Sequence, residues 1–277
     1  MIDIHCHLLP GIDDGPRNWE ESLDLCRAMV DNGITKAVAT PHLIDGIYDN
    51  IRGRVEPLVA DLNSRLRDAD VPLPVLSGAE VDISSRYLTA PAVDLPRLGG
   101  AGAVLLEMPM AVVPHTMADI IFSARSQGMI PILAHPERNE PLQDNLALAE
   151  NWIQAGAVLQ LDGDSLLGVW GKAAKYCAIA LLESGMFHAM ASDAHSCEKR
   201  PPRLHEGLEK AIEIVGKDAR SLVTTGPAML LSGRAPTTPL YAAIPRSTQR
   251  SVIRRERSKS RRLFGLFGQL RRHRKDS

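Results

Sequence analysis

The chain has 277 residues, of which 44% are hydrophobic and 23% charged, and its formal net charge is −1. This length allows one barrel-sized domain or two small ones with a sizeable buried core. No apolar run reaches the roughly 18 residues that a bilayer-spanning helix needs. No charged-then-apolar leader precedes the first strand at Met1, so we expect neither a membrane-spanning nor a secreted protein.

Apolar strand-like runs alternate with amphipathic helical stretches. Strands are predicted at residues 1–4, 34–40, 75–81, 103–108, 129–134, 158–161 and 187–191. The first helix begins after Asn18, has Glu21 in a capping-box position and stops at Gly33. Further helices are predicted at residues 57–66, 117–127, 145–154, 166–183 and 205–215.

Seven strand-then-helix units imply a parallel sheet with helical crossovers. At this length the economical arrangement is an α/β fold of the distorted TIM-like (β/α)7 barrel type, with a basic C-terminal tail. A doubly wound open sheet is the structural alternative. The first loop, at residues 8–16, lacks the Gly-x-Gly-x-x-Gly pattern of a dinucleotide-binding fold.

The first predicted strand ends in His5-Cys6-His7. Residues two apart in a strand point to the same side, so His5 and His7 project together while Cys6 points away. Two imidazoles that converge at the end of a buried strand form half of a metal site.

Other residues of the metal-ligand type stand at or just beyond the carboxyl ends of later predicted strands, or in the first loop. They are Asp14, His42, Glu80, Glu107, His135, Asp193 and His195. In barrels the active site occupies this rim and is built from the ends of several strands. Any one of these residues alone would suit an ordinary solvent-facing loop, but their joint occurrence at one rim favours a metal centre.

The chemistry of this set constrains the metal. Imidazole and carboxylate ligands without a thiolate suit Mn²⁺, Fe²⁺ or Zn²⁺. Nine ligands are too many for one ion, so we expect two or three ions that share bridging carboxylates. Clustered metals lower the pKa of a bound water and favour in-line displacement at phosphorus.

The same residues resemble the full metal-binding set of the PHP (polymerase and histidinol phosphatase) superfamily. The strings MIDIHCHLLPGIDDGP, ATPHLIDGIYDN, GAE, AHPER and ASDAHSCEKRPP are similar to those of the bacterial PHP-class protein-tyrosine phosphatases of capsule and exopolysaccharide loci. The resemblance spans roughly Met1 to Leu231. It implies a seven-unit barrel with a three-metal centre that favours manganese.

The resemblance also implies roles for individual residues. It assigns one metal to His5, His7, Glu80 and Asp193, a second to Glu80, Glu107 and His135, and a third to Asp14, His42 and His195. It makes Arg138 and Arg200 phosphate clamps, a role for which the planar guanidinium is suited. A surface ion pair is the alternative for each arginine. The sequence departs from the family at Asn139, where a Tyr is common, which bears on peptide preference more than on chemistry.

The near-zero net charge conceals an uneven distribution. Twelve of the 32 Lys and Arg residues lie from Arg246 onward, where Glu256 and Asp276 are the acids. An acidic body therefore carries a basic tail, which indicates two functional units. We predict the barrel at residues 1–232, and a Pro-containing linker followed by a basic, flexible tail at 233–277.

The tail contains an apolar helical face, although two glycines weaken the helix. That face is formed by Leu263, Leu266, Phe267 and Leu270. Residues 246–277 would suit an anionic membrane surface, and a solvated disordered tail is the alternative. No nucleic-acid partner is expected, because no binding motif with interleaved aromatic residues occurs.

The cysteines and the tail together indicate the location. The four cysteines show no paired spacing and no zinc-knuckle pattern, and we interpret them as reduced thiols of a cytosolic protein. They are Cys6, Cys26, Cys177 and Cys197. We therefore expect a cytoplasmic protein whose tail reaches the inner face of the membrane.

The leading functional prediction is hydrolysis of phosphotyrosine on protein. A metal-bridging hydroxide would attack phosphorus in line while Arg138 and Arg200 hold the non-bridging oxygens. Tyrosine leaves with a pKa of ~10, so a dedicated general acid is not required. The resemblance implies that the substrate is the phosphotyrosine tail of a membrane-bound bacterial tyrosine kinase of polysaccharide synthesis or export.

Other functions remain as alternatives. A small-molecule phosphatase, such as histidinol-phosphate phosphatase, would use the same centre. Amidohydrolases also begin with a His-x-His strand, but they would place a bridging lysine where Glu80 and Glu107 stand. A non-catalytic metal-binding scaffold is less compatible with a complete ligand set.

Overall fold

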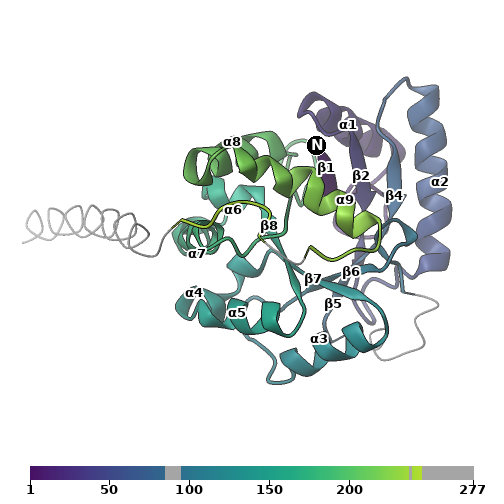
Figure 1. Cartoon of the computed structure of the whole chain (residues 1–277). Helices are drawn as coiled ribbons and strands as arrows, with labels where there is room; N and C mark the ends of the chain where they lie inside the picture. Colours follow the sequence, from purple (N-terminus) through teal and green to yellow (C-terminus); the bar gives the residue numbers. More distant parts are fainter. Residues whose placement is uncertain (85–94, 237–238, 245–277) are drawn as a thin grey trace, which may run out of the picture.

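Short parallel strands form the centre of the fold, and helices lie around them (Figure 1). The computed structural model describes residues 1–84, 95–236 and 239–244. Within them the strands are β1 (Ile2–Cys6), β2 (Lys36–Ala39), β3 (His42–Leu43), β4 (Val75–Ser77), β5 (Glu80–Asp82), β6 (Ala103–Glu107), β7 (Ile130–Ala134), β8 (Val158–Asp162) and β9 (Ala189–Ala191). They form a three-stranded sheet in the order β1-β2-β4 and a six-stranded sheet in the order β3-β5-β6-β7-β8-β9.

The two sheets are segments of one strand ring. Only Thr40 and Pro41 separate β2 from β3, and only Gly78 and Ala79 separate β4 from β5. Gly78, at the second of these breaks, has no room for a side chain. A Cβ there would lie 2.7 Å from Leu98 and 2.9 Å from Val38.

The ring is completed between its first and last strands. The backbone N–H of Asp193 donates to His5 O at 2.9 Å, and that of His7 donates to Ala194 O at 2.8 Å. A parallel bridge pairs Cys6 with Ala194. With β2–β3 and β4–β5 each counted as one interrupted strand, this is the predicted seven-unit, TIM-like arrangement.

The helices cover the outside of the strands (Figure 1). They are α1 (Trp19–Asp31), α2 (Arg52–Asp68), α3 (Met117–Ser126), α4 (Glu140–Asp144), α5 (Ala147–Gln154), α6 (Gly163–Leu167), α7 (Gly171–Glu183), α8 (Leu204–Val215) and α9 (Thr225–Leu231). Short 3₁₀ helices lie at Leu98–Gly100, Pro136–Arg138 and Lys217–Val223.

Local sequence signals explain several of these boundaries. The Asn18 side chain accepts a hydrogen bond from the Glu21 backbone N–H at 3.0 Å, so the predicted N-cap is confirmed. The single helix predicted at 166–183 is instead two, α6 and α7. Gly168, which ends α6, has a φ of +87°, and Gly171, which begins α7, has one of +90°. Only glycine adopts this left-handed conformation at little cost, so the helix is interrupted here.

Alternation along the strands divides the core in two. On β6, Ala103 and Leu105 belong to the smaller buried cluster inside the ring, while Val104 and Leu106 belong to the larger cluster that includes the covering helices. Gln160 of β8 is also fully buried. This polar side chain makes contact with the site described below.

The region after the barrel begins in contact with it. Tyr241 is buried and its hydroxyl accepts a hydrogen bond from the Phe187 backbone N–H at 3.4 Å. The Ile244 N–H donates to Glu183 O at 2.7 Å. Part of the predicted linker therefore packs on the barrel, and the basic tail predicted at 246–277 lies outside the described residues. Among the described helices, none combines the length and apolar character that a membrane crossing requires.

Candidate metal centre

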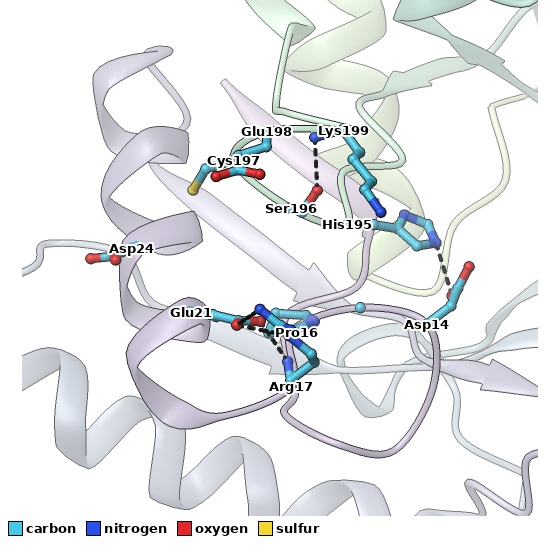
Figure 2. Close-up of a pocket in the computed structure, with 11 residues that line it drawn as sticks. Asp14, Pro16, Arg17, Glu21, Asp24, His195, Ser196, Cys197, Glu198 and Lys199 are labelled. Atoms are coloured by element: carbon cyan, nitrogen blue, oxygen red, sulfur yellow. Dashed lines mark hydrogen bonds and ion pairs between the residues drawn. The ribbon is translucent and has the colours of Figure 1, made fainter.

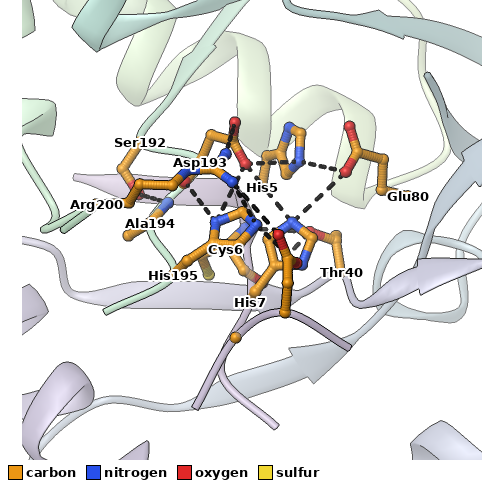
Figure 3. A network of polar contacts seen from close by, with 12 residues as sticks. His5, Cys6, His7, Thr40, Glu80, Ser192, Asp193, Ala194, His195 and Arg200 are labelled. Atoms are coloured by element: carbon orange, nitrogen blue, oxygen red, sulfur yellow. Dashed lines mark hydrogen bonds and ion pairs between the residues drawn. The ribbon is translucent and has the colours of Figure 1, made fainter. Parts of the chain in front are cut away.

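The ligand-type residues predicted from the sequence converge at the carboxyl ends of the strands. His5 lies in β1 and His7 follows that strand directly, His42 comes from β3, Glu80 from β5 and Glu107 from β6. His135 follows β7 directly, whereas Asp193 and His195 follow β9. Asp14 reaches the same rim from the loop after β1. Figure 2 shows Asp14 beside His195, and Figure 3 shows His5, His7, Glu80, Asp193 and His195.

Four buried side chains form the centre of the cluster: His5, His7, Glu80 and Asp193. His5 Nε2 lies 3.2 Å from Glu80 Oε2 and 3.3 Å from Asp193 Oδ1. His7 Nε2 lies 3.5 Å from each of the same two oxygens. Figure 3 shows these groups pointing toward one another.

The atoms that face the middle of this cluster lack hydrogen bonds. Among the buried side-chain atoms of the described residues, those without a hydrogen-bond partner include His5 Nε2, His7 Nε2, His42 Nδ1, Glu80 Oε2 and Asp193 Oδ1. An ion with ligand bonds of about 2.1 Å holds neighbouring ligands roughly 3.0–3.4 Å apart in octahedral or tetrahedral geometry. The observed separations therefore fit metal ligation, and buried polar atoms without partners need such an explanation.

A second group lies toward the protein surface. It consists of His7, Asp14, His42 and His195. Asp14 Oδ1 lies 3.4 Å from His42 Nε2 and 3.2 Å from His195 Nε2. The rings of His7 and His195 stack with centroids 3.7 Å apart. Except for the inclusion of His7, this is the set that the resemblance implies for the third metal.

The third group brings His42 together with Glu80 and Glu107. His42 Nδ1 lies 3.0 Å from Glu80 Oε2 and 3.5 Å from Glu107 Oε2. His135, which the resemblance implies for this metal, lies 2.9 Å from Glu80 Oε1 and 4.0 Å from Glu107 Oε1. Glu80 thus belongs to two of the three groups, as a bridging ligand would.

Two of the rim residues have unusual backbone conformations. His135 has a φ of +31° and Asp193 a φ of +51°. Non-glycine residues rarely adopt this region, and such strain concentrates at functional sites. Here it turns both side chains into the centre at the point where β7 and β9 end.

Two neighbouring residues that the sequence analysis did not single out orient the histidines. Asp13 Oδ2 accepts a hydrogen bond from His7 Nδ1 at 2.7 Å, and Gln160 Oε1 accepts one from His5 Nδ1 at 2.9 Å. With the proton on Nδ1, the Nε2 lone pair of each ring faces the cluster. The adjacent acids Asp13 and Asp14 were the available signal, whereas nothing in the strand pattern marked Gln160.

The charged groups of the cluster strongly shift one another's pKa. Burial alone would lower the pKa of His42, but hydrogen bonds to Glu107 and Glu80 outweigh it and raise the pKa to about 10. Burial opposes ionisation of Glu80 and Asp193, yet their neighbours hold the pKa of both well below its usual range. For Glu80 these neighbours are imidazoles, and for Asp193 they are imidazoles together with Arg138 and Arg200. The two carboxylates therefore attract positive charge, which metal ions would supply.

Cys6 lies between the two histidines but faces away from them. Its thiol is fully buried and donates to Val38 O at 3.2 Å. Burial raises the pKa of this thiol well above its usual value. Cys6 therefore contributes packing, as its position in the strand predicts.

Both predicted phosphate clamps lie beside the centre. Nη2 of Arg138 donates to Asp193 Oδ2 at 2.7 Å, and Nη2 of Arg200 donates to the same oxygen at 2.5 Å. Arg138 also binds Asp162. Among the buried polar atoms of the described residues, the Nε of each arginine lacks a hydrogen-bond partner. Buried donors without acceptors need an explanation, and an anion bound beside them would supply acceptors.

Trp170 lies on the same side of the rim. The Arg138 guanidinium carbon is 4.1 Å from the centre of its ring, and that of Arg200 is 5.4 Å away. Trp170 lies within the stretch predicted as a helix at 166–183, and its indole is partly exposed.

A cavity of about 650 Å³ extends outward from the centre. It begins at Asp14 and His195 and continues past Arg17 of the first loop to Glu198 and Lys199 (Figure 2). Charged side chains of both signs line it. A polypeptide segment could approach the rim from this side.

The fold and the geometry together define a TIM-like barrel with a rim suited to clustered metal ions. The family model described as "Capsular polysaccharide synthesis, CpsB/CapC" matches residues 1–232. The chain belongs to this family.

Two curated relatives illustrate the similarity. The tyrosine-protein phosphatase YwqE of Bacillus subtilis (strain 168) is 32% identical over 275 residues, which cover 96% of this chain and all of that protein. The tyrosine-protein phosphatase CpsB of Streptococcus pneumoniae is 26% identical over 247 residues, covering 83% of this chain and 98% of that one.

Solved structures agree with this assignment. A chain from the crystal structures of YwqE from Bacillus subtilis and CpsB from Streptococcus pneumoniae, described as unique metal-dependent tyrosine phosphatases, superposes with a TM-score of 0.81 at 33% identity, covering 89% of this chain and 100% of that one. The organophosphorus hydrolase of Deinococcus radiodurans superposes with a TM-score of 0.51 at 11% identity, covering 83% and 92%. The latter similarity concerns the fold alone.

Proposed function

We propose that this protein is a metal-dependent protein-tyrosine phosphatase, a phosphoric monoester hydrolase of capsule or exopolysaccharide synthesis. One observation carries the proposal: two arginines with unpartnered Nε donors lie against Asp193, which is itself part of a cluster of inward-facing imidazoles and carboxylates. That arrangement pairs a site for cations with a site for an anion. The names of the curated relatives support tyrosine phosphate as the substrate.

The residues present fit two or three metal ions. His5, His7, Glu80 and Asp193 would hold one, Asp14, His42 and His195 a second, and Glu80, Glu107 and His135 a third. Imidazole and carboxylate ligands support Mn²⁺, with Fe²⁺ or Zn²⁺ as alternatives. Bound there, such ions supply a water of lowered pKa and positive charge that offsets the charge developing on the phosphoryl group.

Arg138 and Arg200 would bind the non-bridging phosphate oxygens. A guanidinium presents several N–H donors in a fixed plane that matches phosphate. Burial lowers the pKa of Arg138, but Asp162 and Asp193 outweigh that effect and raise it above its usual value. Arg138 is therefore charged at neutral pH. The departing tyrosinate has a pKa of ~10 and needs little protonation to leave.

Turnover of three phosphate esters tests this function. The metal-loaded protein should hydrolyse a phosphotyrosine peptide far faster than histidinol phosphate or a phosphoserine peptide, and chelation should abolish the activity until Mn²⁺ is added. Preferential hydrolysis of histidinol phosphate would identify a small-molecule phosphatase instead. Metal binding without hydrolysis of any ester would indicate a regulatory scaffold.

The proposal extends to substrate and location. We place the enzyme in the cytoplasm, acting on the phosphotyrosine tail of a membrane-bound bacterial tyrosine kinase. The barrel at residues 1–232 would carry the activity, and the basic tail at 246–277 would contact the anionic inner surface of the membrane. The abundance of Lys and Arg in that tail supports this assignment.

Vesicle sedimentation tests the tail. The full chain should sediment with vesicles containing phosphatidylglycerol and not with phosphatidylcholine vesicles, and deletion of residues 246–277 should abolish the difference while phosphotyrosine peptide turnover in solution stays unchanged. Equal sedimentation of the full and shortened chains with anionic vesicles would refute the membrane role.

A further inference from the structure

Trp170 occupies an unusual place between two helices. It follows Gly168, which ends α6 in a left-handed conformation, and precedes Gly171, which begins α7. The two glycines turn the short connection at the carboxyl end of β8 outward. Val169 is 49% exposed and Trp170 is 37% exposed.

The indole is held in one orientation by a buried acid. Its Nε1–H donates to Asp162, which is fully buried at the end of β8. The same carboxylate also accepts from Arg138 and from the Asp164 backbone N–H. A side chain whose polar atom is fixed in this way presents its apolar face at a defined position.

Trp170 is also more exposed than the side chains that link it to the metal centre. The Asp193 side chain is 2% exposed, and that of Arg138, which binds it, is 8% exposed. The indole lies over the Arg138 guanidinium at 4.1 Å and within 5.4 Å of that of Arg200. A tryptophan face attracts such cations, so one ring contacts both proposed phosphate clamps from the more exposed side.

We propose that Trp170 determines specificity for aryl phosphate monoesters by packing its exposed surface against the aromatic ring of the substrate. A phosphate held by Arg138 and Arg200 has its ester oxygen, and therefore its aryl group, next to those guanidinium groups. The indole borders the same two groups. Aromatic pairs prefer offset-stacked or edge-to-face arrangements with centroids about 4.5–7 Å apart, and a partly exposed, anchored indole can provide either one.

Another aromatic candidate is less well placed. Tyr48 stacks on His42 with ring centroids 6.0 Å apart and thus contacts a proposed metal ligand, not the arginines. Asn139, which follows Arg138, is buried as the N-cap of α4 and donates to Pro109 O and Val112 O. It therefore supplies no ring contact beside the two arginines.

This inference rests on the proposed function, but binding measurements test it separately from turnover. The probes are phenylphosphonate, methylphosphonate and inorganic phosphate, each titrated into the Mn²⁺-loaded protein by calorimetry. The variants are Trp170→Leu and Trp170→Phe. The matched control is Trp19→Leu, because Trp19 also stacks against an arginine, Arg65 at 4.4 Å, but lies on α1.

Trp170→Leu should weaken phenylphosphonate binding by about tenfold, the size of one aromatic contact, and leave methylphosphonate and phosphate binding near the wild-type values. Trp170→Phe should retain most of the preference, and Trp19→Leu should retain all of it. An equal loss for all three probes in Trp170→Leu would show that the indole only supports the arginines. Unchanged phenylphosphonate binding would also overturn the proposal, whereas failure of peptide turnover with an intact phenyl preference would count against the proposed function alone.

Discussion

Asp13 offers the most detailed test of how the site is held together. Its Oδ2 accepts from His7 Nδ1 at 2.7 Å and from the His42 backbone N–H at 3.2 Å, and its Oδ1 accepts from the Gly15 N–H at 2.9 Å. Burial opposes ionisation of Asp13, but His7 outweighs it and lowers the pKa of this carboxyl. The carboxylate therefore fixes the His7 ring and increases its basicity as a ligand.

The magnitude follows from these contacts. Removing a carboxylate that orients a metal-binding histidine typically lowers metal affinity by about 10–100-fold, which corresponds to roughly 1.4–2.7 kcal/mol. Asp13→Ala loses all three contacts and should fall at the upper end. Asp13→Asn has one acceptor oxygen, so its NH₂ group must face either the Gly15 N–H or the His7 and His42 donors. It should fall at the lower end.

The assay is a Mn²⁺ titration of chelated protein against a competing fluorescent chelator, followed by peptide turnover at each free Mn²⁺ concentration. Asp61→Asn is the matched control, because this exposed acid pairs with Arg65 on α2. Excess Mn²⁺ should restore much of the turnover of both Asp13 variants. If Asp13→Ala binds Mn²⁺ as tightly as the Asp61→Asn control, the assigned role of Asp13 is wrong.

Three further outcomes are expected. Chelation should lower the melting temperature, because Mn²⁺ at 100 times its dissociation constant stabilises the folded state by about 2.7 kcal/mol; an unchanged melting curve would contradict this. Burial lowers the pKa of His188 to about 4. Below pH 6.5 the unfolded chain therefore binds a proton that the folded chain excludes. The free energy of unfolding should consequently fall by about 3 kcal/mol between pH 6.5 and pH 4. His188→Asn, whose amide oxygen can accept from the Leu159 N–H as the ring does, should lack that part of the pH dependence in urea titrations. Gly226→Ala should destabilise the fold by about 2–3 kcal/mol or more, because its Cβ would lie 1.9 Å from His188 O, and urea unfolding equal to wild type would refute the close approach.

Much of the site was predictable because parallel strands deliver their carboxyl ends to one rim. A histidine or acid that follows an apolar run is therefore informative even when the runs are far apart in sequence, as for His5 and Asp193. The structure brings these residues within 3.3 Å. The assignment of residues to individual ions stays a prediction, since both His42 and His135 lie close to Glu80.

Residues that support the ligands were not predicted, for a physical reason. Gln160 has the residue type of an ordinary buried polar side chain, and its role depends on where β8 lies relative to β1. Trp170 fitted the helical pattern of its surroundings. The pair of glycines at 168 and 171 was the signal for a break, but glycine inside a helical pattern is only a weak indication.

The apolar patterns in the sequence also did not reveal the strand interruptions. Residues 75–81 were predicted as one strand, whereas Gly78 and Ala79 divide them into β4 and β5. Leu98 and Val38 lie so close to Gly78 that a side chain there would clash, a long-range contact that an apolar pattern does not reveal. That interruption matters for function, because Glu80 begins the second segment and projects into the centre.

Metal content per chain, measured together with turnover of a phosphotyrosine peptide, tests the central claim most directly. We predict more than one ion per chain and metal-dependent hydrolysis for the wild type. Asp193→Ala, which removes a carboxylate shared by His5, His7 and both arginines, should lose bound metal and nearly all turnover. Undiminished turnover by Asp193→Ala, or by wild-type protein freed of metal, would contradict the account.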